Sequence, residues 1–195
     1  MMNNSLIEEM KEFALRNDVP IMEDDALFFL SQFVADHHIK SLLEIGSAIG
    51  YSSSFLALDN PQLRIVTVEI DEERSAMAVR NIEKAGLSDR IKVINCDARE
   101  YETDEQFDAI LLDGPKAHNR ELKKRLEGNL KKGGYLIVDD VYFHGLVNHL
   151  ELVRTRRLRT LVRKIGEFQK ELLEDPDYET TYIEIGDGLL TARKR

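Results

Sequence analysis

Short apolar runs rich in β-branched residues alternate with amphipathic segments through the middle of this chain, and this alternation constrains its fold most strongly. Strands are predicted at 41–45, 64–70, 91–95, 107–112 and 135–138, and helices at 51–58, 72–85 and 119–130. The strands are apolar on both faces, which is typical of a parallel sheet between helix layers. Ligands of such sheets bind beyond the carboxyl ends of the strands.

The two ends of the chain depart from this alternation. Helix-like stretches at 6–16 and 24–37 precede the first strand, and we expect residues 1–38 to form a helical cap or lid. A long amphipathic stretch at 151–173 is followed by a predicted antiparallel hairpin at 180–185 and 189–192. The prediction is a single domain over 1–195, with an α/β core over 39–195 and a mostly parallel, seven-stranded sheet covered by helices on both faces.

Composition narrows the class of protein. The 195 residues include 27 basic and 36 acidic side chains, giving a net charge of −9, which argues against coating nucleic acid with the whole surface. Cys96 is the single cysteine and cannot form an internal disulfide, so we expect a reducing compartment, by default the cytoplasm. No apolar run approaches the roughly 18 residues of a membrane helix, and no secretion signal is expected.

A glycine-containing loop follows the first predicted strand. Gly46 and Gly50 lie between this strand and a predicted helix, where backbone N–H groups can approach a ligand closely. Glu69 ends the second strand, where a carboxylate can accept both hydroxyls of a ribose. A tight turn without a ligand would explain the loop by itself. The loop and Glu69 together predict a nucleoside pocket.

Two further acidic residues bear on the nature of this nucleoside. Glu44 would repel a pyrophosphate but can help to hold a cationic, amino-acid-bearing ligand, which favours S-adenosylmethionine over NAD. Asp97 follows the third strand, where it can accept a hydrogen bond from an adenine amino group. Asp97 is equally explained as a helix N-cap, and both roles can coexist.

Carboxylates also end the fourth and fifth predicted strands. Asp113 follows one strand, and Asp139 and Asp140 follow the other, so the three should converge on one edge of the sheet. Such a set suits Mg²⁺ or a similar hard divalent ion. Lys116 can act as a proton acceptor if its pKa is lowered beside a metal. The alternatives are carboxylates that cap neighbouring segments and an exposed loop lysine.

These motifs resemble those of the metal-dependent class I O-methyltransferases, the family of catechol and caffeoyl-CoA methyltransferases. The resemblance spans residues 20 to 192 and includes 44–52, Glu69, 113–116 and 139–140. Within the family the chain is most similar to the bacterial tRNA 5-hydroxyuridine methyltransferases, on the segments 19–22, 141–147, 156–165, 176–178 and 186–189. The resemblance implies a Rossmann-like methyltransferase fold and methyl transfer from S-adenosylmethionine to a hydroxyl. It also suggests a homodimer.

The resemblance assigns roles to individual residues. It implies that Asp113, Asp139 and Asp140 hold the metal, that Asp113 also faces the cofactor, and that Lys116 is the catalytic base. Cofactor contacts are implied for Met22 near the methyl donor, Gly46 and Ser52 at the methionine portion, Glu69 at the ribose, Asp97 and Ala98 around the adenine, and Glu44. The chain departs from the family at Asp140, usually asparagine, and at Pro115, usually small or acidic.

A basic segment bears on the substrate. Six positive charges lie within 154–164, at Arg154, Arg156, Arg157, Arg159, Arg163 and Lys164. They form a plausible track for RNA phosphates, or else a solvated helix face or dimer contact. The leading hypothesis is a methyltransferase that converts 5-hydroxyuridine to 5-methoxyuridine in a tRNA anticodon loop. The alternatives are a small-molecule catechol methyltransferase and, least favoured, a non-catalytic S-adenosylmethionine-binding module.

Overall fold

The computed structural model describes residues 2–195, with side chains described from Ser5 onward. The chain forms two compact units, Met1–Glu102 and Thr103–Arg195, and each is described by itself. Among the described residues, no helix has both the length and the apolar character needed to cross a membrane.

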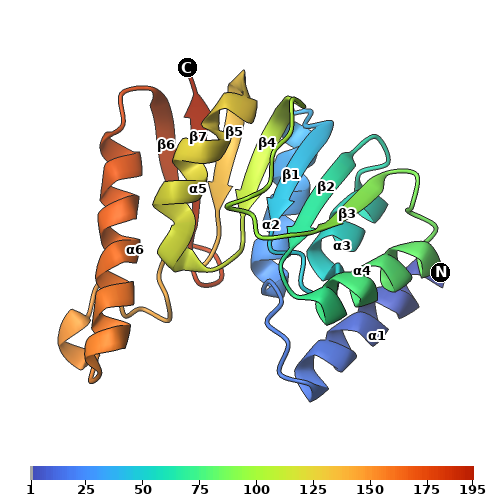
Figure 1. Cartoon of the computed structure of the whole chain (residues 1–195), viewed down its shortest axis with the longest axis horizontal. Coiled ribbons are helices and arrows are strands. Elements are labelled where there is room, and N and C mark those ends of the chain that lie inside the picture. The colour runs from blue at the N-terminus through green and yellow to red at the C-terminus, as the bar shows by residue number, and fades with distance from the viewer. Residues whose placement is uncertain (1) are drawn as a thin grey trace. The chain divides into compact units, whose positions relative to one another are not determined.

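The first unit contains a parallel three-stranded sheet and four helices (Figure 1). Its strands lie in the order β3-β2-β1. Along the chain the elements are α1 (Met2–Arg16), α2 (Asp24–Asp36), β1 (Ser41–Ile45), α3 (Tyr51–Asp59), β2 (Arg64–Glu69), α4 (Glu72–Lys84) and β3 (Ile91–Asn95). Both N-terminal helices pack against α3, and α4 packs on β2 and β3. The elements thus follow the predicted alternation, and the lid role of residues 1–38 stays a prediction.

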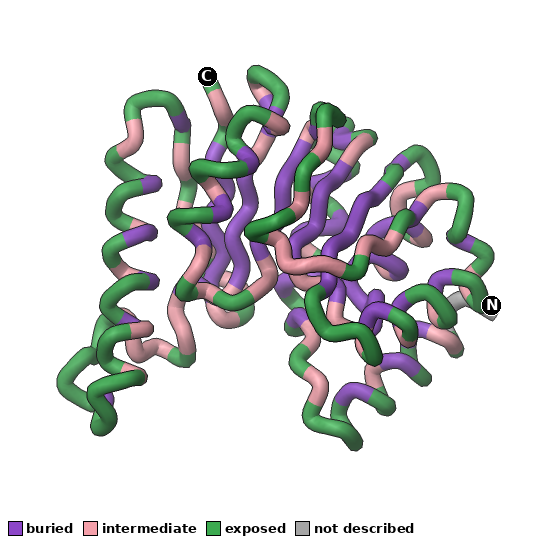
Figure 2. Tube along the Cα trace, in the orientation of Figure 1, coloured by how far each residue is buried: buried purple, intermediate pink, exposed green. Residues whose placement is uncertain are grey.

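The second unit contains two parallel strands extended by the C-terminal hairpin. Its strands lie in the order β4-β5-β7-β6, with β4 and β5 parallel and the remaining pairs antiparallel. The main elements are β4 (Phe107–Leu112), α5 (Asn119–Leu126), β5 (Leu130–Val138), α6 (Arg156–Glu174), β6 (Tyr178–Ile183) and β7 (Leu189–Lys194). Short 3₁₀ turns lie at Lys116–His118, Glu127–Asn129 and Leu150–Leu152. Strands β1, β2, β4, β5 and β7 are largely buried, whereas β3 and β6 each have a single buried residue (Figure 2).

Predicted boundaries in the second unit are wrong by four or more residues at two places, and the hairpin strands differ from the predicted ones by two residues. The helix predicted at 119–130 ends at Leu126, and β5 begins at Leu130 and runs through Gly133 and Gly134. Glycine is required at position 134 of this strand, because a Cβ there would lie 2.8 Å from the carbonyl oxygen of Asp108. The register between β4 and β5 also shifts at this point, as in a β-bulge.

The other wrong boundary is the start of the last helix. The amphipathic pattern predicted one stretch over 151–173, but α6 begins at Arg156 because the Thr155 hydroxyl accepts a hydrogen bond from Leu158 N at 3.3 Å. The buried face of α6 is the predicted apolar one, with Val162, Ile165, Phe168 and Leu172. Arg154 therefore lies outside the helix that carries the other basic residues.

Candidate active site

The loop after β1 is the cofactor candidate in the first unit. Gly46 and Gly50 have φ of 101° and 78°, and Ala48 is also left-handed at 44°. Ala48 N donates to one Glu69 carboxylate oxygen at 2.8 Å, and Asp71 N donates to the other at 2.9 Å. Glu69 thus links the end of β2 to the loop after β1. Its ribose role stays a prediction.

The Ser47 side chain is an observation that fits a ligand at this loop. Its Oγ is buried and has no hydrogen-bond partner among residues 5–195. A buried hydroxyl without a partner is costly, and a polar group of a nucleoside or amino acid would satisfy it. The loop therefore fits a polar cofactor by geometry as well as by sequence.

Glu44 is held inside the first unit. Its carboxylate is fully buried and accepts hydrogen bonds from the Ser52 hydroxyl at 2.5 Å and from the Thr67 hydroxyl. Burial raises the pKa of Glu44, while these hydrogen bonds act to lower it. Thr67 was not predicted, because its hydroxyl comes from the neighbouring strand β2. Glu44 and Ser52 form a polar support beneath the loop, and their cofactor roles stay predictions.

Asp97 caps a turn rather than a helix. Its carboxylate accepts from Arg99 N at 2.9 Å and pairs with the Arg99 guanidinium, with 2.5 Å between Oδ2 and Nη2. The prediction that Asp97 is a helix N-cap is wrong, because residues 98–100 form a hydrogen-bonded turn and not a helix. Ala98 is half-buried beside it, and Met22 is buried in the segment between α1 and α2. The adenine and methyl-donor roles of these residues stay predictions.

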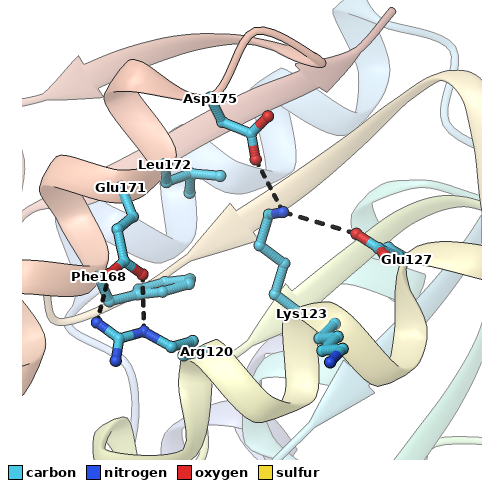
Figure 3. Close-up of a pocket in the computed structure, with 8 residues that line it drawn as sticks. Arg120, Lys123, Glu127, Phe168, Glu171, Leu172 and Asp175 are labelled. Atoms are coloured by element: carbon cyan, nitrogen blue, oxygen red, sulfur yellow. Dashed lines mark hydrogen bonds and ion pairs between the residues drawn. The ribbon is translucent and has the colours of Figure 1, made fainter.

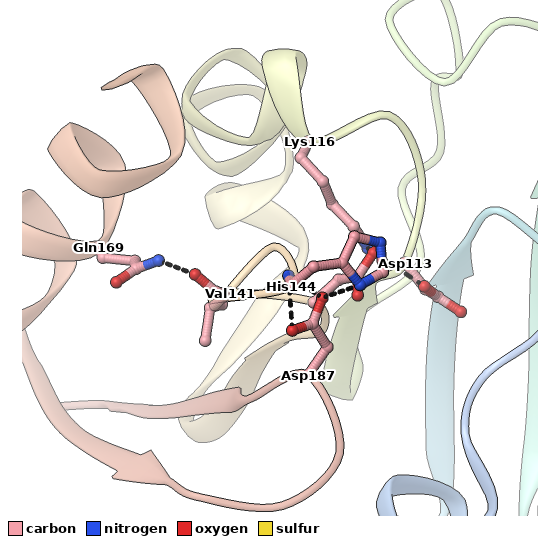
Figure 4. Close-up of polar contacts among 7 residues, drawn as sticks. Asp113, Lys116, Val141, His144, Gln169 and Asp187 are labelled. Carbon is pink, nitrogen blue, oxygen red and sulfur yellow. Dashed lines mark hydrogen bonds and ion pairs between the residues drawn. The ribbon is translucent and has the colours of Figure 1, made fainter. Parts of the chain in front are cut away.

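The predicted carboxylates of the second unit gather around one amine. Lys116 Nζ lies 3.3 Å from Asp113 Oδ1 and 3.7 Å from Asp140 Oδ2, and the Lys116 side chain is 9% exposed. Figure 4 shows Lys116 directed toward Asp113. Asp139 is buried at the end of β5 and hydrogen-bonds to Asp113. The sequence therefore correctly predicted that these groups lie together.

The electrostatics of this cluster follow from burial and proximity. Burial, and then the charge of Asp113, hold the pKa of Asp139 well above its usual range. Burial would lower the pKa of Lys116, but the three neighbouring aspartates outweigh it and raise that pKa. Lys116 is therefore an ammonium at neutral pH in this arrangement. The described residues contain no group of three or more His, Cys, Asp or Glu side chains that could hold a metal ion as they stand.

A fourth carboxylate next to the cluster was missed by the sequence analysis. Asp187 lies in the turn between β6 and β7, and both of its oxygens accept from His144 N at 2.7 Å. The sequence Gly186-Asp187-Gly188 predicted only a hairpin turn. No local signal identifies the His144 contact, because the two residues are 43 positions apart.

The basic segment lies on the surface of the second unit. All six basic side chains within 154–164 belong to exposed residues. Arg159 donates to the carbonyl of Val153 at 3.1 Å, and Arg163 Nε lies 3.6 Å from a Glu167 carboxylate oxygen. In residues 5–195 no ion pair is found for the remaining four, which are Arg154, Arg156, Arg157 and Lys164. Their charges face solvent.

A separate hollow of about 250 Å³ lies between α5 and α6 (Figure 3). Arg120 forms a two-point contact with Glu171, at 2.7 and 2.5 Å, and Lys123 Nζ lies 2.9 Å from Asp175 Oδ2. These opposite charges pair with each other across the hollow. We interpret it as a clamp between two helices rather than as a ligand site.

Comparison with known proteins identifies the family of the chain. A family model described as O-methyltransferase matches residues 1–195. The caffeoyl-CoA O-methyltransferase of Populus kitakamiensis is 31% identical over 176 residues, which cover 85% of this chain and 74% of that protein.

Solved structures give the same result. A Staphylococcus aureus protein described as a candidate caffeoyl-CoA O-methyltransferase has a TM-score of 0.92 and 32% identity, covering 97% of this chain and 92% of that one. The Bacillus cereus O-methyltransferase in complex with SAH has a TM-score of 0.83 and 27% identity, covering 98% and 91%. The fold is the Rossmann-like methyltransferase fold, with seven mostly parallel strands and an antiparallel C-terminal pair, as predicted. The chain belongs to the O-methyltransferase family and is an S-adenosylmethionine-dependent enzyme of the caffeoyl-CoA O-methyltransferase type.

Proposed function

We propose that this enzyme is a divalent-metal-dependent methyltransferase that converts 5-hydroxyuridine in a tRNA anticodon loop to 5-methoxyuridine. The observation that carries the metal dependence is the gathering of three aspartates around one buried amine in the second unit. The Lys116 ammonium balances one carboxylate of the three, and oxygen donors are those that Mg²⁺ prefers. The donor set therefore fits a hard dication, which would require the carboxylates to turn toward a common point.

Asp113, Asp139 and Asp140 would hold the ion. A bound dication supplies a Lewis acid that lowers the pKa of the acceptor hydroxyl and orients its oxygen. If a dication neutralised the aspartate charges, burial would be the dominant remaining influence on Lys116 and would lower the pKa of that amine. Lys116 Nζ would then be the group that accepts the hydroxyl proton. On this proposal the lysine is a base only in the loaded enzyme.

The basic segment supports an RNA substrate. The chain carries a net charge of −9, yet six cations lie within 154–164 on one exposed stretch. Arg156, Arg159 and Arg163 follow helical spacing on α6, so they share one side of that helix. A base in an anticodon loop is single-stranded and can be splayed into a pocket while the loop phosphates contact such cations.

Mass spectrometry of tRNA nucleosides from cells lacking the gene tests this function. We expect 5-methoxyuridine to disappear and 5-hydroxyuridine to accumulate. Re-expression of the unmutated enzyme should restore the modification, while Asp113→Ala should not. Unchanged 5-methoxyuridine in the deletion strain would refute the tRNA substrate.

The second candidate is a small-molecule catechol or phenolic methyltransferase. It is favoured by the names of the relatives, which include caffeoyl-CoA O-methyltransferases. A catechol offers two neighbouring oxygens to a metal, and 5-hydroxyuridine offers the same pair through its C5 hydroxyl and C4 carbonyl. Competition in vitro separates them: faster methylation of catechol than of hydroxyuridine-containing anticodon stem-loops at moderate salt would favour the small molecule.

A further inference from the structure

We propose that Asp187 is a positioning residue, whose carboxylate holds the segment 140–144 in the conformation that directs Asp140 toward Lys116. The proposal rests on the proposed function in one respect, because Asp140 is taken there as a metal ligand. It extends that function by assigning a role to the turn between β6 and β7. Asp187 acts through the backbone of another segment and is not assigned contact with the substrate.

The segment 140–144 has a backbone that must be held by outside contacts. Asp140, Phe143 and His144 all lie in the left-handed region, with φ of 63°, 48° and 54°. Side chains other than glycine rarely adopt this region, and such residues persist where the surrounding structure determines them. Three of them within five positions require strong contacts from a neighbouring element.

The turn around Asp187 supplies these contacts (Figure 4). His144 N donates to both Asp187 carboxylate oxygens at 2.7 Å, and Tyr142 N donates to the Asp187 carbonyl, also at 2.7 Å. Val141 N donates to the carbonyl of Gly188 at 3.0 Å. Three of the four N–H groups that follow Asp140 are therefore bound by two residues of one turn.

Two further observations show how closely the segment is fitted. Gly188 is left-handed at φ +83°, and a Cβ there would lie 2.7 Å from Tyr142 Cδ2 and 3.0 Å from Val141 Cγ2. On the other side, Gln169 of α6 donates to the carbonyl of Val141. The segment is thus held by the turn and by α6 together.

The Asp187 carboxylate also reaches the cluster itself. Its side chain is 11% exposed and is hydrogen-bonded to Asp140. Asp140 Oδ2 in turn lies 3.7 Å from Lys116 Nζ. A continuous chain of contacts therefore runs from the hairpin turn to the proposed metal-binding carboxylates.

Asp187→Ala and Asp187→Asn in the full-length protein test the proposal with two readouts besides turnover. The first is hydrogen exchange of the 140–147 backbone in chelator-treated protein. The second is Mn²⁺ affinity measured by electron paramagnetic resonance. For Asp187→Ala we expect faster exchange and Mn²⁺ binding weakened about 10- to 100-fold, as for partners that orient metal ligands. Asp187→Asn keeps one acceptor oxygen, so its exchange rate and its Mn²⁺ affinity should lie between those of Asp187→Ala and those of the unmutated protein.

Glu184→Ala is the matched control, since it removes an exposed acid from the same hairpin and should change neither readout. Unchanged exchange at 140–147 in Asp187→Ala would overturn the proposal. So would a lowered melting temperature with unaltered Mn²⁺ affinity, because this indicates a role in stability alone. If the unmutated protein binds no Mn²⁺, the metal part of the proposed function fails, while the exchange measurement still decides whether Asp187 holds the segment.

Discussion

Replacing Lys116 with methionine tests the electrostatics of the aspartate cluster. Methionine retains most of the apolar stem of lysine, so the main change is the loss of one positive charge beside Asp113 and Asp140. The Lys116 side chain is only 9% exposed, so water screens the loss poorly. Removing one partner of a buried ion pair costs about 3 to 5 kcal/mol.

The size of the effect should depend on pH, because Asp139, whose pKa is raised, can take up a proton. The pKa of Lys116 is raised in the folded protein, so its stabilisation is complete at neutral pH and is lost only as the pH rises through that pKa. Asp139 also has a raised pKa, so folding stability falls as the pH rises through its titration. The charge of Lys116 acts to lower the pKa of Asp139, so its removal raises that pKa further and makes the fall in folding stability with rising pH larger. We expect Lys116→Met to lose about 3 kcal/mol of unfolding free energy at pH 8 and less at pH 5, where the folded protein holds the Asp139 proton more fully.

Urea denaturation at pH 5 and pH 8, with a chelator present, measures this difference. Lys132→Met is the control, because Lys132 belongs to the same unit and is exposed. It should change the unfolding free energy by less than about 0.5 kcal/mol at both pH values. An equal loss for Lys116→Met at the two pH values would refute the reasoning, as would no loss at pH 8.

Three other predictions concern the supports of the two sites and the basic segment. Gly188→Ala should lower the free energy of unfolding by about 2 to 4 kcal/mol in thermal or urea denaturation, because the new Cβ would collide with Tyr142. Gly86→Ala is the control: a Cβ there would meet nothing within 4 Å, and the loss should be only about 1 kcal/mol. Equal losses for the two variants would contradict this reasoning. Glu44→Ala should cost about 3 kcal/mol, because two buried hydroxyls lose their acceptor, and unchanged stability would show that they find other partners. A triple variant replaces three arginines of α6 with alanine: Arg156, Arg159 and Arg163. In filter-binding assays with anticodon stem-loops, it should lower the magnitude of the slope of log binding constant against log salt concentration by about 2. An unchanged slope would exclude these side chains from phosphate contact.

The order of elements was predictable because β1, β2, β4 and β5 end as short apolar runs followed by glycine or acidic residues. β1, β3 and β4 have the predicted bounds. The start of β5 was not predictable, because Gly133 and Gly134 are typical of a helix end. This part of the chain is a strand because it pairs with β4, and the close approach of Gly134 to the backbone of Asp108 explains the glycine; no local pattern contains either contact.

The meeting of the aspartates was predictable from topology, since parallel strands end at the same edge of a sheet. The charge state of Lys116 was not predictable, because it depends on whether the three nearby carboxylates outweigh the effect of burial on its pKa. Asp187 was missed for the same reason: its carboxylate binds a backbone N–H 43 residues away. Sequence patterns identify residue types at strand ends, whereas contacts between distant loops need coordinates.

Methyl transfer to tRNA in the presence and absence of a divalent ion is the most direct measurement of the proposed chemistry. Chelator-treated enzyme, labelled S-adenosylmethionine and tRNA containing 5-hydroxyuridine are incubated with and without added Mg²⁺, alongside Asp113→Ala. We expect labelled 5-methoxyuridine only from the unmutated enzyme with Mg²⁺. Equal labelling after chelation, or full activity of Asp113→Ala, would contradict a metal-assisted reaction at these aspartates.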